Sequence, residues 1–130
     1  MYFAVWIPFV LVDIIWLRTM GERLYRPVLS DILRSEPQLG PAVLFYVIYP
    51  LGLLLFAVLP AHASGGGLRA VLLGLLFGFF TYATYDLTNQ ATLRNWSPVL
   101  TVIDVLWGSA LAGTCAYLGY LASTRLLGTV

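Results

Sequence analysis

Four apolar runs separated by short polar stretches dominate the chain, and they cover residues 2–17, 41–59, 70–87 and 98–122. About 20 apolar residues in a helix cross the hydrocarbon core of a bilayer, so the last three runs fit a membrane span. The first run is short for a span, and a start a few residues upstream would explain this. The pattern predicts an all-α, polytopic membrane protein with four transmembrane helices in a single domain, residues 1–130.

Local signals mark the ends of the runs. Pro41 and Pro98 stand at first helical positions, where a missing N–H group costs nothing, and Ser97 is a good N-cap for the fourth span. The glycine-rich stretch 62–67 predicts a flexible hairpin between the second and third spans. We expect His62, at the start of this hairpin, to be a solvated loop residue.

The stretch between the first two spans has a different pattern of apolar and polar residues. Over residues 27–34, apolar positions recur at helical spacing and polar positions take the opposite face, and prolines bound the segment. This pattern predicts a short amphipathic helix that lies in the headgroup region of the membrane. A helix in a plain solvated loop is the alternative.

Composition supports the membrane interpretation, because 60% of residues are hydrophobic, 10% are charged and the mean hydropathy is +0.87. The net charge of +1, with no basic stripe, argues against nucleic acid as a partner. The lipid bilayer is the partner that the composition implies. Cys115 is the single cysteine, so it cannot form an internal disulfide, and we interpret it as a small packing residue.

The arginines predict an orientation in the membrane. Five of them flank the first and third loops, and two lie on the other side. The positive-inside rule therefore places these two loops in the cytoplasm and both termini outside it. The five are Arg18, Arg23, Arg26, Arg34 and Arg94, and the two are Arg69 and Arg125.

Three aspartates, Asp13, Asp86 and Asp104, lie inside the apolar runs or at their ends. A carboxylate at the bilayer centre costs roughly 2.5–3.5 kcal/mol on insertion scales, so such residues usually face a bundle interior or a wet cavity. In the predicted topology all three lie in the cytoplasmic half of the bilayer. This coincidence predicts one shared site.

Neighbouring residues support that site. Gly74 and Gly78 form a small-residue stripe that leads to Asp86, and a similar stripe follows Asp104, so both acids should face neighbouring helices. We expect Tyr82 and Asn89 to donate hydrogen bonds to Asp86 from its own helix. Aromatic side chains in this half can hold a carboxylate or a ligand, although they could also form an interfacial aromatic belt. The candidates beside the acids are Trp16, Tyr46, Tyr49, Tyr82, Tyr85, Asn89 and Trp107.

Standard catalytic and cofactor signatures are absent from the sequence: it has no glycine-rich phosphate loop, histidine cluster or Cys-x-x-Cys motif. Three carboxylates could hold a hard cation, but without an Asp-x-Asp spacing no metal site is predicted. The cofactor, and whether the protein is an enzyme, stay open.

Several motifs together resemble a known family. They are Asp13-x-x-Trp16, the segment Tyr-Ala-Thr-Tyr-Asp-Leu-Thr-Asn-Gln-Ala-Thr at 82–92, and Asp104-x-x-Trp107-Gly108. They are similar to a bacterial family of predicted four-helix membrane proteins that is catalogued as a domain of unknown function. The resemblance spans almost the whole chain and implies a four-helix inner-membrane fold, without a known activity.

Three functions remain open. The first is a membrane protein that binds a ligand or proton in a cytoplasm-facing polar cavity, most concretely for proton-coupled transport of a small, partly apolar or cationic solute. Since four short helices enclose little volume, we expect such a transporter to be a homodimer. The second is an accessory subunit of a larger respiratory, photosynthetic or assembly complex. The third is an intramembrane enzyme that acts on a lipid or isoprenoid, with an aspartate as general acid.

Overall fold

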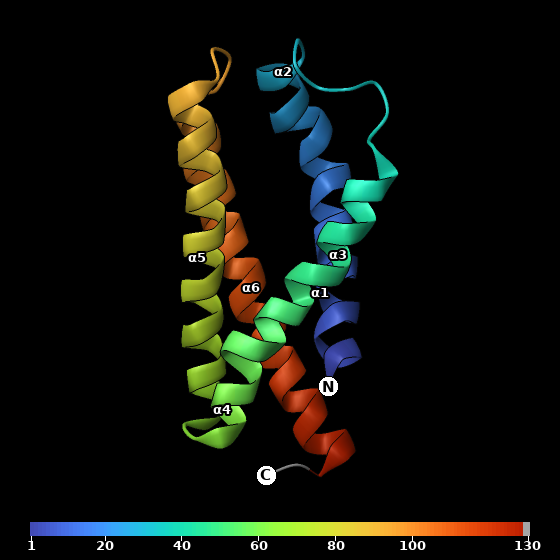
Figure 1. Cartoon of the computed structure of the whole chain (residues 1–130), viewed down its shortest axis with the longest axis vertical. Coiled ribbons are helices and arrows are strands. Elements are labelled where there is room, and N and C mark those ends of the chain that lie inside the picture. Colours follow the sequence, from blue (N-terminus) through green and yellow to red (C-terminus); the bar gives the residue numbers. More distant parts are fainter. Residues whose placement is uncertain (129–130) are drawn as a thin grey trace.

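A computed structural model describes residues 1–128, and within them the fold consists of helices and connecting turns. Four helical segments are long and apolar enough to cross a membrane: Tyr2–Leu29, Leu39–Ala63, Gly66–Thr92 and Pro98–Leu127. They contain each of the four predicted runs and extend all of them. Figure 1 shows them running up and down the long axis of the molecule, with both chain ends toward the same end. The predicted four-helix membrane fold is confirmed.

The first segment is one long helix, made of α1 (Tyr2–Met20), a π-helical turn η1 (Gly21–Tyr25) and α2 (Arg26–Leu29). The expected span therefore continues well beyond residue 17, which removes its apparent shortness. The amphipathic stretch 27–34 does not form a separate helix. Its first residues complete α2, and turns and irregular chain follow up to the start of the second segment.

The second segment consists of α3 (Leu39–Leu53), a π-helical turn η2 (Leu54–Val58) and α4 (Leu59–Ala63). Both π turns end two residues before a proline, Pro27 after η1 and Pro60 after η2. A proline in a helix donates no backbone hydrogen bond, and its ring crowds the carbonyl group four residues earlier. A wider π turn relieves this crowding, and it also rotates the side chains that follow relative to those before.

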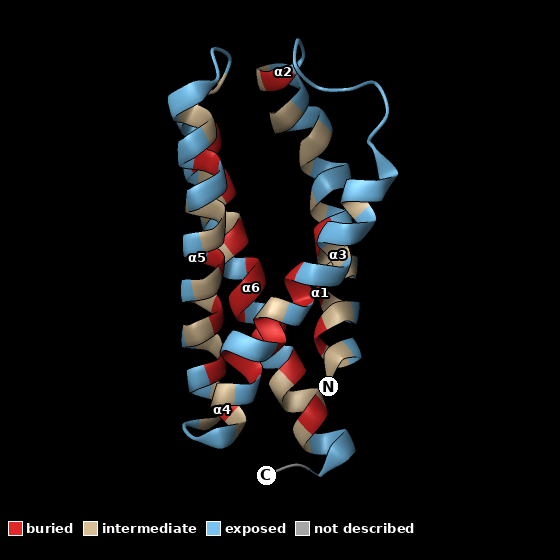
Figure 2. Ribbon diagram, in the orientation of Figure 1, coloured by how far each residue is buried: buried red, intermediate tan, exposed pale blue. Residues whose placement is uncertain are grey.

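The third and fourth segments, α5 (Gly66–Thr92) and α6 (Pro98–Leu127), form a closely packed antiparallel pair. A Cβ atom added to Gly74 would lie 2.7 Å from the carbonyl oxygen of Ala112, and one added to Gly78 would collide with the backbone of Gly108. The predicted small-residue stripe is thus confirmed as the contact between these helices. Figure 2 shows the buried residues on the faces that the helices turn toward each other.

The second segment crosses the bundle obliquely. Its first part, α3, packs against α1, whereas its later parts, η2 and α4, pack against α5. In Figure 1, α3 accordingly begins beside α1, and the segment then crosses toward α5 on its way to the α4–α5 connection. The second segment therefore lies close to α5 at one end of the bundle and away from it at the end that carries the first and third loops, whereas α1 packs against α6.

Two local signals had different outcomes. Ser97 caps α6 as predicted, since its hydroxyl oxygen accepts a hydrogen bond of 3.1 Å from the backbone N–H of Val99. The prediction for His62 was wrong, because α4 extends through it. Its Nε2 atom lies 2.7 Å from the hydroxyl oxygen of Ser123, and its ring centroid lies 4.6 Å from that of Tyr120. His62 thus ties the second segment to α6.

Candidate functional site

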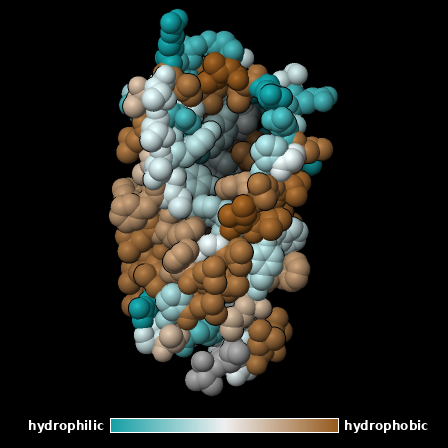
Figure 3. Space-filling model, viewed as in Figure 1, coloured by the Kyte–Doolittle hydropathy of each residue, from teal (hydrophilic) through white to brown (hydrophobic). Residues whose placement is uncertain are grey.

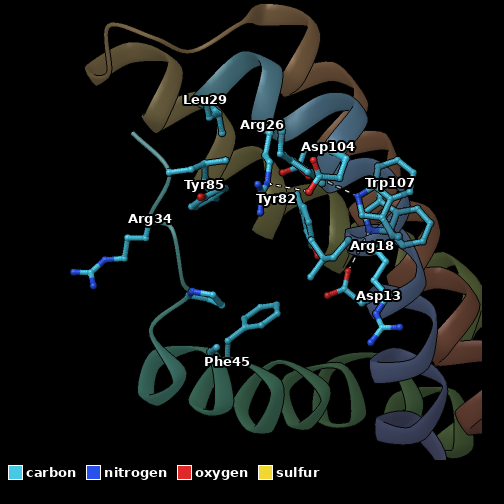
Figure 4. Close-up of a pocket in the computed structure, with 18 of the residues that line it drawn as sticks. Asp13, Arg18, Arg26, Leu29, Arg34, Phe45, Tyr82, Tyr85, Asp104 and Trp107 are labelled. Atoms are coloured by element: carbon cyan, nitrogen blue, oxygen red, sulfur yellow. Dashed lines mark hydrogen bonds and ion pairs between the residues drawn. The ribbon is translucent and has the colours of Figure 1, made fainter. Parts of the chain in front are cut away.

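A cavity of about 1080 Å³ occupies the end of the bundle at which α3 lies away from α5. Its walls come from the first helix, the following loop, α3, α5 and α6, and most of them are apolar or aromatic (Figure 4). One chain alone forms a cavity of this size, open on one side, whereas the sequence led us to expect that four helices enclose little volume. Of the predicted site residues, those that line the cavity are Asp13, Trp16, Tyr46, Tyr49, Tyr82, Tyr85, Asp104 and Trp107, whereas Asp86 and Asn89 do not.

Asp13 joins three helices at the inner end of the cavity. Its side chain is almost completely buried. The hydroxyl group of Tyr46, on α3, donates a hydrogen bond of 2.6 Å to Oδ2, and the indole N–H of Trp107, on α6, donates a longer one of 3.4 Å to Oδ1. Both carboxylate oxygens therefore have a donor, which is what a buried carboxylate needs in order to carry charge.

Asp104 has a similar arrangement with different donors. The hydroxyl group of Tyr25, at the end of η1, donates a hydrogen bond to Oδ1. The same hydroxyl oxygen accepts a hydrogen bond of 2.9 Å from the indole N–H of Trp16. A chain of hydrogen bonds thus runs from α1 through the π turn to α6, with the carboxylate at its end.

The two indole rings lie between the two acids. Trp16 and Trp107 stack with their centroids 4.1 Å apart and their planes 6° from parallel. The tryptophan of each Asp-x-x-Trp segment therefore supports the aspartate of the other segment. Trp107 donates to Asp13 of the opposite helix, and Trp16 reaches Asp104 of the opposite helix through Tyr25.

Asp86 lies behind this wall and is completely buried. The expectation that Tyr82 and Asn89 hold it was wrong, since neither Asp86 oxygen accepts a hydrogen bond from an N–H or hydroxyl donor in the described part of the chain. The close approach of α5 to α6 explains the difference. In this packing, the ring of Tyr82 lies against the backbone of Gly108, and the Asp86 carboxyl group lies beside that of Asp104.

The pairing of Asp86 with Asp104 has a consequence for charge. Two neighbouring carboxylates that are withdrawn from water repel each other when both are ionised. Asp104 is the member that lines the cavity, and Asp86 is the member that does not. The cavity wall therefore carries one carboxyl group with a second directly behind it.

Basic side chains also line the cavity. They are Arg18, Arg26 and Arg34, and a further acid, Glu22, lies among them. Glu22 forms an ion pair with Arg26, with 3.2 Å between Oε1 and Nε. Arg26 and Arg34 lie toward the loop, whereas Arg18 lies on α1 only five residues from Asp13, so the basic side chains are not confined to one end of the cavity (Figure 4).

Tyr25 is the site residue that sequence reasoning missed. It lies nine residues beyond Trp16, which in an unbroken α-helix is two and a half turns and places the two on opposite faces. The π turn η1 inserts an extra residue and brings the Tyr25 hydroxyl to Trp16. The one sequence signal that could have indicated this was Pro27, which follows the π turn, had the first helix been extended across it.

Comparison with known proteins agrees with the fold and adds no activity. The chain matches no curated protein and no solved structure. A family model described as "Predicted membrane protein (DUF2177)" matches residues 1–121, which is nearly the whole chain. The resemblance seen in the Asp-x-x-Trp and Tyr-x-x-Tyr-Asp motifs is thereby confirmed, and the chain belongs to this family of membrane proteins.

Proposed function

We propose that this protein binds a small, largely apolar cation in its cavity and exchanges it there for a proton. The observation that carries the proposal is the form of the cavity: apolar and aromatic walls lead to Asp13 and Asp104, and each carboxylate accepts a hydrogen bond from a tyrosine on another element. Following the arginine distribution, the cavity opens toward the cytoplasm.

The lining suits a cation with apolar substituents. Aromatic faces attract cations, more strongly when both are withdrawn from water. Here the stacked indoles of Trp16 and Trp107 and the rings of Tyr82 and Phe45 line the same space as Asp13. A volume of about 1080 Å³ is ample for a drug-sized molecule, since such sites span about 300–1,000 Å³.

Charge balance favours exchange for a proton. In this proposal, the Asp86–Asp104 pair holds a proton when the cavity contains no other cation, because two ionised carboxylates side by side would repel each other. A cation that arrives beside Asp104 stabilises the fully ionised pair, so the proton leaves as the cation binds. One positive charge enters and one leaves, which avoids the cost of burying an extra charge in the bundle.

The rest of the bundle supports coupling to transport, which is the more specific form of the proposal. Beyond Asp13 the cavity is closed by a hydrophobic core that includes Phe9, Leu53 and Val58. Transport would require this end to open in turn. The π turn η2 lies within that core beside Pro60, and it is the element of the second segment whose helical hydrogen bonding is already irregular.

Binding of tetraphenylphosphonium, an apolar cation that cannot itself carry a proton, tests the proposal. Isothermal titration calorimetry of the purified protein in phosphatidylcholine nanodiscs should detect saturable binding that weakens at least tenfold in Asp13→Asn and Asp104→Asn. Asp31→Asn is the matched control, because Asp31 is exposed, accepts a hydrogen bond from Asn95 and does not line the cavity. Absence of binding, or equal binding by all four proteins, would overturn the proposal.

A further inference from the structure

We infer that the cation is the headgroup of a single-chain amphiphile, which enters the cavity sideways from the bilayer between α3 and α5. This inference rests on the proposed function and specifies its substrate class. It follows from where the cavity opens, from what flanks the opening and from the charge at the aqueous rim.

The opening follows from the oblique path of the second segment. α3 packs against α1 and touches α5 through Tyr49, whose hydroxyl oxygen lies 2.8 Å from that of Thr81, and the segment packs closely on α5 only from η2 onward. On the loop side of this contact, Ala42 and Phe45 from α3 and Tyr85 from α5 line the cavity. Figure 3, which looks across the helix axes, shows the surface hollowed in its upper half, between these two helices.

The surface beside this opening is apolar. Val43 and Leu44 follow Ala42 on α3 and are 60% and 58% exposed, and Phe80 on α5 is 63% exposed. Side chains of this kind on a membrane-spanning helix face lipid. An alkyl chain can therefore pass from the bilayer into the cavity without crossing a polar surface.

The aqueous route is less favourable for a cation. Arg26 and Arg34 line the cavity on the loop side, and Arg26 is paired with Glu22. A cation approaching from water meets this positive excess before it reaches Asp13 or Asp104. An amphiphile that is already dissolved in the bilayer avoids the rim, and its headgroup can slide along the aromatic wall to the acids while its chain remains against apolar residues.

The test compares two quaternary ammonium ions in phosphatidylcholine nanodiscs: dodecyltrimethylammonium, which dissolves in the bilayer, and butyltrimethylammonium, which stays in water. Ala42→Phe narrows the lateral opening, and Val43→Phe, on the neighbouring lipid-facing position, is the matched control. Stopped-flow tryptophan fluorescence should show association of the dodecyl compound slowed about tenfold or more by Ala42→Phe alone. Association of the butyl compound should be unchanged. Phe45→Ala, which widens the opening, should increase the association rate of the dodecyl compound.

The remaining outcomes would contradict the inference, and one of them would contradict the proposed function as well. Equal slowing of both compounds by Ala42→Phe, no slowing of either, or the same slowing by Val43→Phe would overturn lateral entry. Binding of the butyl compound without the dodecyl compound would overturn the amphiphile and leave the proposed function standing. Tighter binding of dodecyl phosphate than of dodecyltrimethylammonium would show that the arginine rim selects an anion, and would contradict the inference. If neither ammonium compound binds, the proposed function fails and the inference fails with it.

Discussion

Replacement of Tyr25 by Phe removes one hydroxyl group on which the arrangement around Asp104 depends. That hydroxyl donates to Asp104 and accepts from Trp16. A hydrogen bond to a charged group contributes about 1.5–3 kcal/mol and a neutral one about 1 kcal/mol. Hydrogen bonds within membrane proteins average nearer 0.6 kcal/mol. Because water in the adjoining cavity can replace part of the loss, we expect Tyr25→Phe to lower the free energy of unfolding by about 1–3 kcal/mol.

Function should change as well, and in a manner that a loss of stability alone does not explain. Without its phenol donor, the ionised form of Asp104 is less stabilised. Tetraphenylphosphonium therefore displaces the proton less readily and binds more weakly. Reversible unfolding in mixed detergent micelles gives the stability, and calorimetry gives the affinity.

Tyr117→Phe is the control, since Tyr117 lies on α6 outside the cavity and its side chain is partly exposed. It should leave both stability and affinity close to those of the unmodified protein. If Tyr25→Phe also leaves both unchanged, the hydrogen-bond chain from Trp16 to Asp104 does not contribute as argued here.

Three further predictions concern packing, proton binding and topology. Gly74→Ala should lower the unfolding free energy by about 1–3 kcal/mol, because its new Cβ atom meets the α6 backbone. Gly40→Ala, whose Cβ atom would have no atom within 4 Å, should change it little. Equal effects of the two substitutions in thermal unfolding would contradict the packing. Asp86→Asn should fold yet bind tetraphenylphosphonium with little dependence on pH between 5 and 9, and a pH profile like that of the unmodified protein would contradict the carboxyl pair. A cysteine at Ser64 should react with a membrane-impermeant maleimide from outside, and one at Ser30 only after permeabilisation; the reverse result would invert the topology.

The sequence was sufficient to predict the features that depend on local pattern. Hydrophobic runs predicted the four spans, and the glycines at 74 and 78 predicted the close approach of α5 to α6. The placement of three acids in one half of the bilayer also predicted their proximity. These features follow from hydropathy and side-chain size, which each segment carries by itself.

Features that depend on the register between helices could not be predicted in this way. The donors to Asp86 were expected on its own helix, whereas the packing of α5 against α6 turns that carboxyl group toward Asp104. Tyr25 reaches Trp16 because a π turn alters the helical phase, and residue spacing does not reveal where such a turn forms. The size of the cavity likewise results from the oblique path of α3, which no single segment encodes.

The number of protons released per bound cation tests the central claim most directly. Titration of the protein in nanodiscs with tetraphenylphosphonium, in two buffers of equal pH and different ionisation enthalpy, gives this number at each pH between 5 and 9. The account predicts that release approaches one proton per bound cation within this range and is largely lost in Asp86→Asn. Saturable binding that releases no proton at any pH in the range would contradict it.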